Sequence, residues 1–110
     1  MRSVFFISDL TGITAEALGN ILLTHFGDIE FTRDNLAYID SLEKAEKAAM
    51  KIKVASKADG QPALIFSTQI KNECRQVLEH CGGVVFDFLE TFISKMVYTC
   101  GENSAHAAGL

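Results

Sequence analysis

The sequence predicts an α/β protein with three layers: a four-stranded, mainly parallel sheet flanked by helices. Short apolar runs alternate with segments whose apolar residues recur at helical spacing, in the order β-α-β-α-β-α-β-α. Polar turn or cap residues separate the two kinds of segment. A strand that is buried on both faces reads as a continuous apolar run, so this alternation indicates a parallel sheet that helices cover.

The composition suits one folded domain. The chain has 110 residues, of which 48% are hydrophobic and 22% charged, and this balance favours a packed core over disorder. The net charge is −4 and the lysines are interleaved with acids, so no basic stripe indicates a nucleic-acid partner. No apolar run approaches the ~20 residues that span a bilayer. No signal-peptide pattern is present, and we expect a cytoplasmic protein without a membrane partner.

The first strand is expected at residues 4–7. A helix should follow and end at Gly27-Asp28. Its predicted buried face consists of Ala17, Leu18, Ile21, Leu22 and Phe26.

The second strand is expected within residues 29–39, with residues 36–39 as its most strand-like part and residues 33–35 as a bend or bulge. Asp40 is the predicted cap of the next helix, since residues 40–43 resemble a capping box. Residues 58–62 should break that helix. The buried positions predicted for it are Leu42, Ala45, Ala49 and Ile52.

Two further strand–helix units complete the predicted domain, residues 1–101, with residues 102–110 as a flexible tail. The strands are expected at residues 63–66 and 84–86, and the last helix should close at Gly101. The predicted buried face of the first of these helices consists of Ile70, Cys74, Val77, Leu78 and Cys81. In the second helix, another apolar stripe at helical spacing consists of Leu89, Phe92, Ile93, Met96 and Val97.

The three cysteines have no metal-site spacing, and no metal site is predicted. Cys74 and Cys81 are seven residues apart and share one helical face, so we interpret them as core thiols.

The strongest candidate site lies where the first strand turns into a helix, at residues 8–14. The first N–H groups of a helix lack partners within it and carry partial positive charge, which suits an anion. Ser8, Thr11 and Thr14 add hydroxyl donors, and Gly12 lets the backbone approach a ligand. The alternative is structural: Thr11 or Thr14 caps the helix and Gly12 turns the chain.

Polar residues follow each of the four predicted strands: Ser8-Asp9, Asp40-Ser41, Ser67-Thr68 and Asp87. Ligands of parallel sheets bind outside the carboxyl ends of the strands, so these turns should converge on one edge. Asp9 repels a phosphate, and its expected role is to orient a hydroxyl or a metal or to act as a general base. His106 is the one histidine outside a predicted helix end, and it is a further candidate.

Familiar nucleotide-binding motifs are absent from the 110 residues. Neither G-x-x-x-x-G-K-[ST] nor G-x-G-x-x-G occurs.

Residues 4–16, Val-Phe-Phe-Ile-Ser-Asp-Leu-Thr-Gly-Ile-Thr-Ala-Glu, resemble the opening of the phosphoenolpyruvate synthase and pyruvate, phosphate dikinase regulatory proteins. Residues 66–68 are similar to the family's third strand end, and residues 87–93 to its fourth strand and following helix. Ser104, His106 and Gly109 fit the segment that leads toward the family's nucleotide domain. The resemblance implies an N-terminal domain of a bifunctional serine/threonine kinase and pyrophosphorylase.

The family uses ADP to phosphorylate a threonine of its target and uses inorganic phosphate to remove that phosphate, releasing pyrophosphate. The resemblance therefore implies ADP and phosphate as substrates of the full-length protein, with no cofactor in this chain. It implies phosphoenolpyruvate synthase or pyruvate, phosphate dikinase as the partner. The family's P-loop lies downstream of the matched region, so we expect these 110 residues to be inactive alone.

Two further interpretations stay open at this stage. One is a non-catalytic α/β module that binds an anion or a protein. The other is a homodimer formed through an exposed surface around Met96, Val97 and Tyr98. Both the kinase domain and the binding module would use the same residues. The candidates for contact with phosphate or the target are Ser8, Thr11, Gly12, Thr14, Ser67, Thr68, Asp87 and His106. Asp9 is the catalytic candidate.

Overall fold

The structure is a computed structural model that describes residues 1–101, and the predicted tail and His106 lie outside the described residues. The elements are β1 (Arg2–Ile7), α1 (Ile13–Leu23), β2 (Phe31–Leu36), α2 (Leu42–Asp59), β3 (Leu64–Ser67), α3 (Asn72–Glu79), β4 (Val84–Asp87) and α4 (Phe88–Cys100). The predicted α/β alternation is confirmed.

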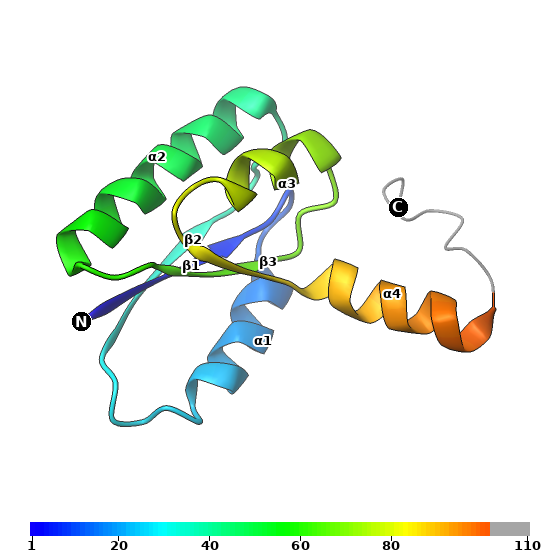
Figure 1. Cartoon of the computed structure of the whole chain (residues 1–110), viewed down its shortest axis with the longest axis horizontal. Helices are drawn as coiled ribbons and strands as arrows, with labels where there is room; N and C mark the ends of the chain where they lie inside the picture. The colour runs from blue at the N-terminus through cyan, green and yellow to red at the C-terminus, as the bar shows by residue number, and fades with distance from the viewer. Residues whose placement is uncertain (102–110) are drawn as a thin grey trace.

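The four strands form one sheet in the order β2-β1-β3-β4, and every neighbouring pair is parallel. Helices α2 and α3 lie on one side of the sheet and α1 lies on the other (Figure 1). Helix α4 continues from the end of β4 and extends away from the sheet (Figure 1). Among residues 1–101, no helix has the length and apolar character needed to cross a membrane.

Alternate side chains of the central strands build a core on each side of the sheet, because successive residues of a strand point to opposite faces. Phe5 and Ile7 of β1 pack with Ile65 of β3 beneath α2 and α3. Val4 and Phe6 pack on the α1 side. The members of the α1-side core are Val4, Phe6, Ala15, Leu23, Phe66 and Phe88.

The core between the sheet and helices α2 and α3 also confirms the expectation for two cysteines. Cys74 and Cys81 are fully buried in it, as predicted for core thiols. Burial raises the pKa of both thiols, which keeps them protonated and unreactive.

Helix α1 presents a different face to the sheet from the one predicted. Ala15, Gly19 and Leu23 are buried, whereas the predicted face is exposed and the helix ends before Gly27. The reason is close packing: a Cβ atom on Gly19 would lie 2.5 Å from the Phe6 ring and 2.9 Å from the Phe66 ring. Small residues therefore occupy the contact between α1 and the sheet, and the large apolar side chains of α1 stay exposed.

Strand β2 also differs from its prediction. The strand occupies Phe31–Leu36 and includes residues 33–35, which were expected to bend. Residues 37–39 leave the strand, and Tyr38 adopts a left-handed φ of 58°. Because β2 is an edge strand, polar side chains fit its outer positions, and Asp34 pairs with Lys51 of α2 at 2.8 Å.

The cap of α2 lies one residue later than predicted. Ser41 is the N-cap, and its hydroxyl accepts a hydrogen bond from the backbone N–H of Lys44. Asp40 instead forms an exposed ion pair with the Lys44 ammonium at 2.8 Å. Three of the four predicted buried residues of α2 are buried, and Leu42, next to the cap, is 43% exposed.

Helix α4 has the predicted bounds but lacks a partner for its apolar stripe. Its C-cap is Gly101, as expected, and only Phe88 at its start is buried. Phe92 and Met96 are 57% and 61% exposed among the described residues. The helix leaves the body of the domain (Figure 1), so the surface at Met96 and Tyr98 is exposed, as expected from the sequence.

The contact of Gly19 with the two phenylalanine rings yields a stability prediction. In an exposed helix, Gly→Ala stabilises by about 1 kcal/mol. We expect Gly19→Ala instead to lower the free energy of unfolding by about 1–2 kcal/mol, because overpacking a tight contact costs more. Denaturant unfolding followed by circular dichroism measures the change.

Gly27→Ala is the matched control, since a Cβ atom there would have no other atom within 4 Å and its φ is not in the left-handed region. We expect Gly27→Ala to change the free energy of unfolding by no more than about 0.5 kcal/mol. A Gly19→Ala variant as stable as the control would contradict the assigned packing of α1.

Candidate functional site

A cavity of about 390 Å³ lies at the carboxyl edge of the sheet, where β1 and β3 end. It brings together six of the predicted site residues: Ser8, Asp9, Thr11, Gly12, Thr14 and Thr68. Leu10, Ile13, Ile70 and Leu89 supply the rest of its wall. The predicted convergence of polar turns on this edge therefore holds for the turns after β1 and β3.

Ser8 anchors the turn after β1. Its side chain is buried, and its hydroxyl oxygen accepts a hydrogen bond of 3.0 Å from the backbone N–H of Leu10. The Ser8 carbonyl accepts from the N–H of Ile39, which fixes the turn to the segment after β2. The N–H of Thr68 donates to the carbonyl of Ile7 at 3.0 Å, so the turns after β1 and β3 are joined directly.

Gly12 is required by the geometry of the wall. It is the N-cap of α1 with a φ of 80°, a conformation that side chains with a Cβ rarely adopt. A Cβ atom there would lie 2.5 Å from Oδ1 of Asn35. Asn35 is itself fixed, because its Nδ2 donates to Glu16 at 2.8 Å.

No side chain caps the start of α1. The expectation that Thr11 or Thr14 caps the helix is therefore wrong, because the N-cap is Gly12, whereas Gly12 does turn the chain, with a φ of 80°. The Thr11 hydroxyl oxygen reaches only the N–H of Ile13, at a long 3.4 Å. The positive end of α1 thus forms part of the cavity wall, as an anion site requires.

The other predicted residues lie elsewhere. Ser67 is buried behind the wall, where its hydroxyl accepts from the N–H of Gln69. Asp87 caps α4 by accepting from the N–H of Glu90, and its second oxygen pairs with Arg75. The turn after β2 contributes neither Asp40 nor Ser41 to this cavity.

Arg75 is the residue that the sequence analysis missed. Its Nε lies 2.9 Å from Asp87 and its Nη2 lies 2.9 Å from Glu90. It lines a second cavity of about 210 Å³, which shares Ile70 and Leu89 with the first. The one available signal was its place near the start of α3, since helices that follow parallel strands begin at the carboxyl edge.

The charges around Arg75 are mutually stabilised. Burial opposes its charge, but the hydrogen bonds and charges of Glu90 and Asp87 prevail and raise the pKa of Arg75. The hydrogen bond from Arg75, with the one from the Ser94 hydroxyl, lowers the pKa of Glu90. The guanidinium is therefore a permanent cation whose charge two carboxylates offset.

The chemistry of the first cavity is that of an anion or hydroxyl site. Asp9 is the only acidic side chain in its wall, and no cluster of three His, Cys, Asp or Glu residues occurs within residues 1–101. Hydroxyls and the start of α1 supply donors, while Asp9 supplies one proton acceptor. An oxygen-bearing ligand with one ionisable hydroxyl matches this set of groups.

Comparison with known proteins gives one consistent result. The sequence model of the kinase/pyrophosphorylase family matches residues 4–110. Relatives from Hahella chejuensis, Alkalilimnicola ehrlichii and Herminiimonas arsenicoxydans are 45%, 44% and 43% identical over 108 residues, 98% of this chain. All three are named as regulatory proteins of phosphoenolpyruvate synthase. The chain spans only 40%, 39% and 38% of their respective lengths.

The lowered pKa of Glu90 predicts a pH dependence of stability. A carboxylate whose pKa is lowered in the folded state stabilises the fold at pH values above its unfolded-state pKa, about 4.3. This contribution is lost as the pH falls through the folded-state pKa. We expect Glu90→Gln to be less stable than the parent at pH 7, with the difference shrinking as the pH falls below about 4.3.

Urea unfolding at a series of pH values measures this difference. Glu79→Gln is the matched control, because Glu79 is exposed on α3 and forms no ion pair within residues 1–101. A Glu90→Gln difference that stays constant from neutral to acid pH would contradict the ion pair with Arg75.

Proposed function

This chain belongs to the kinase/pyrophosphorylase family, and we therefore propose that it supplies the target-phosphate site of a bifunctional regulatory enzyme. In this proposal the full-length protein phosphorylates a threonine of phosphoenolpyruvate synthase or pyruvate, phosphate dikinase with ADP. It removes the phosphate with inorganic phosphate. The names of the relatives support the first of the two targets.

The observation that carries the proposal is the gathering of Ser8, Asp9, Thr11, Gly12, Thr14 and Thr68 around one cavity at the sheet edge. The segment that supplies five of the six lies within the family match at residues 4–110. Hydroxyl donors and the uncapped start of α1 suit the phosphate oxygens. The cavity's volume of about 390 Å³ gives room for a side chain, which a phosphorylated threonine requires.

Asp9 has the role of proton acceptor in this proposal. As the threonine oxygen bonds to the transferred phosphorus, the phosphorus–oxygen bond to AMP breaks and the threonine proton passes to Asp9. In the dephosphorylation step an oxygen of inorganic phosphate bonds to the phosphothreonine phosphorus, the phosphorus–oxygen bond to threonine breaks, and the threonine oxygen takes a proton from Asp9 as pyrophosphate is released.

Asp9→Asn tests the role of the carboxylate. We define the family-length chimera as the Hahella chejuensis relative in which this chain replaces the matching segment. Loss of a general base should lower kcat for ADP-dependent phosphorylation of phosphoenolpyruvate synthase by about 100-fold or more. The KM for the target should change little, because Asn keeps the shape of Asp.

Asp28→Asn is the matched control, since Asp28 is an exposed loop residue outside the cavity. It should retain the parental kcat. An Asp9→Asn chimera with parental kcat would show that the carboxylate takes no part in the transfer.

Thr11→Val tests anion binding separately from proton transfer. Removing one hydroxyl donor at unchanged shape should weaken inorganic phosphate binding by about five- to tenfold, the loss that one hydrogen bond predicts. Isothermal titration of the chimera with phosphate measures the affinity, and circular dichroism checks the fold.

Thr32→Val serves as its control, because Thr32 is exposed on the edge strand β2. If Thr11→Val and Asp9→Asn both leave phosphate affinity and transfer at the parental level, the turn is only structural. If affinity falls and transfer does not, the non-catalytic binding module is the better account of this chain.

A further inference from the structure

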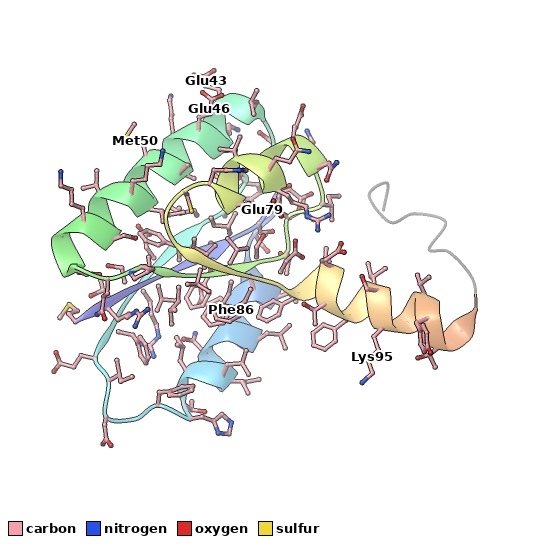
Figure 2. The ribbon with its side chains drawn as sticks, in the orientation of Figure 1. Glu43, Glu46, Met50, Glu79, Phe86 and Lys95 are labelled. Carbon is pink, nitrogen blue, oxygen red and sulfur yellow. The ribbon has the colours of Figure 1, made fainter. Side chains whose placement is uncertain are left out.

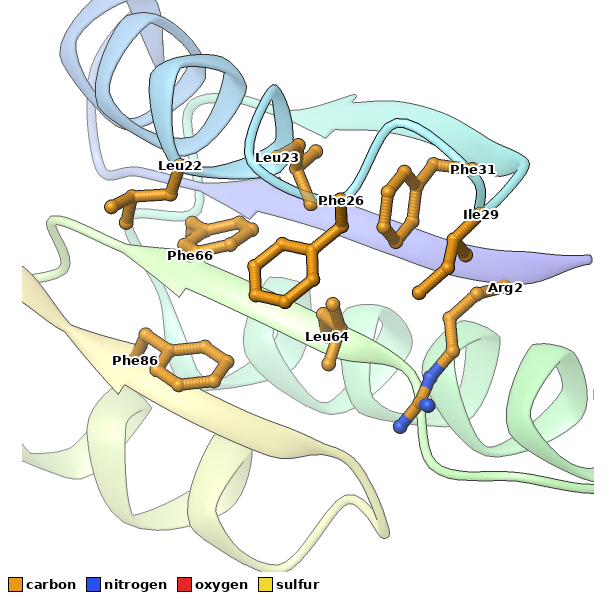
Figure 3. Close-up of a pocket in the computed structure, with 9 residues that line it drawn as sticks. All are labelled: Arg2, Leu22, Leu23, Phe26, Ile29, Phe31, Leu64, Phe66 and Phe86. Atoms are coloured by element: carbon orange, nitrogen blue, oxygen red, sulfur yellow. The ribbon is translucent and has the colours of Figure 1, made fainter.

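A third cavity, of about 390 Å³, lies at the opposite end of α1 from the first one, and its wall is almost entirely apolar (Figure 3). We call it the apolar groove. The residues that line it are Arg2, Leu22, Leu23, Phe26, Ile29, Phe31, Leu64, Phe66 and Phe86. Figure 3 shows Leu22, Leu23 and Phe26 on the α1 side of the groove and Leu64, Phe66 and Phe86 on strands β3 and β4.

The groove exists because one face of the sheet is only half covered. Within residues 1–101, this face is covered by α1 and by Phe88 at the start of α4, whereas α2 and α3 both lie on the other face (Figure 1). Phe66 stacks on Phe86 at a centroid distance of 5.3 Å, and the Phe86 side chain is still 42% exposed. Parallel sheets are normally covered on both faces, so a cover over β3 and β4 is lacking within residues 1–101.

The rim of the groove is equally apolar. Leu22, Phe26 and Ile29 are 45%, 56% and 46% exposed, and they stand next to one another along the end of α1 and the loop that follows. Monomeric proteins rarely expose a continuous apolar surface of this kind unless another chain segment or protein covers it.

We propose that the apolar groove receives the apolar face of an amphipathic helix from the part of the family polypeptide that this chain does not span. The relatives are about two and a half times as long as the matched segment, since it covers 38–40% of them. That remaining polypeptide is covalently tethered to the groove, which gives it a high effective concentration there. A helix is the element that covers the faces of parallel sheets.

The one charged residue of the groove fixes the chemistry of the occupant at one end. The Nε of Arg2 donates to the carbonyl of Pro62 at 3.0 Å, and its Nη1 donates to Gln61. The guanidinium is thus held in place while it borders the groove. A carboxylate, or the negative end of the docking helix, complements this cation. The occupant should therefore combine an apolar stripe with an acidic or C-terminal end.

Hydroxyl-radical footprinting of the 110-residue chain and of the family-length chimera tests the proposal without any measurement of activity. Phe26 and Phe86 report on the groove. Met50, 61% exposed on α2, reports on the other side of the sheet, and Figure 2 labels it together with Phe86. In the chimera, oxidation of Phe86 should fall about tenfold, following the ratio of its exposed fraction to that of Phe66, 42% to 3%. Met50 should be oxidised equally in both.

Two substitutions make the test specific. Phe26→Asp in the chimera should restore oxidation of Phe86, because a carboxylate on the rim excludes an apolar helix. Leu22→Asp is a second variant with the same expected effect, in case the first perturbs the loop after α1. Met50→Asp is the control and should leave Phe86 protected.

Equal oxidation of Phe26 and Phe86 in the chain and the chimera would overturn the proposal. So would protection of these rings in the 110-residue chain that appears only at high concentration, together with a dimer mass by light scattering, because the occupant would then be a second copy. Failure of the phosphate-transfer tests leaves this result untouched, since footprinting reads contact alone.

Discussion

The position of α1 on the sheet depends on the missing side chain of Gly19. Because only hydrogen occupies that position, the helix approaches the rings of Phe6 and Phe66 closely. This close contact also determines where the two ends of α1 lie on the sheet. Its first residues form part of the wall of the cavity at the carboxyl end of β1, and its last turn borders the apolar groove over β3 and β4. One close helix–sheet contact therefore positions the two surfaces through which this chain is proposed to act.

Sequence patterns predicted the order and type of all eight elements because buried strands and one-sided helices have distinct periods. The face of α3 was predictable, since Cys74 and Leu78 are apolar and buried. The face of α1 was not, because tight packing selects Ala15 and Gly19, which a search for large apolar residues ignores. Strand β2 lies within the expected residues 29–39, but residues 33–35 were expected to bend because an edge strand carries polar residues that resemble those of a turn.

The candidate site was predictable only where it is local in sequence. The run from Ser8 to Thr14 forms one turn, so its residues had to lie together. Asp87 was assigned to the same site because it ends a strand, but Arg75, twelve residues earlier on a different element, holds it away. No periodicity relates these two residues. This ion pair depends on how α3 packs beside β4, the other edge strand of the sheet, and only the three-dimensional structure reveals it.

The central place of β1 has a consequence for synthesis of the chain. Val4 pairs with Leu64, so the strand made first completes its pairing only after some sixty more residues have been added. At about 5–20 residues per second that interval lasts several seconds. Until then β2 is its only available partner, and a two-stranded ribbon is marginally stable in water. Until β3 has been added, the apolar side chains of β1 that pack with Ile65 and Phe66 therefore lack these partners.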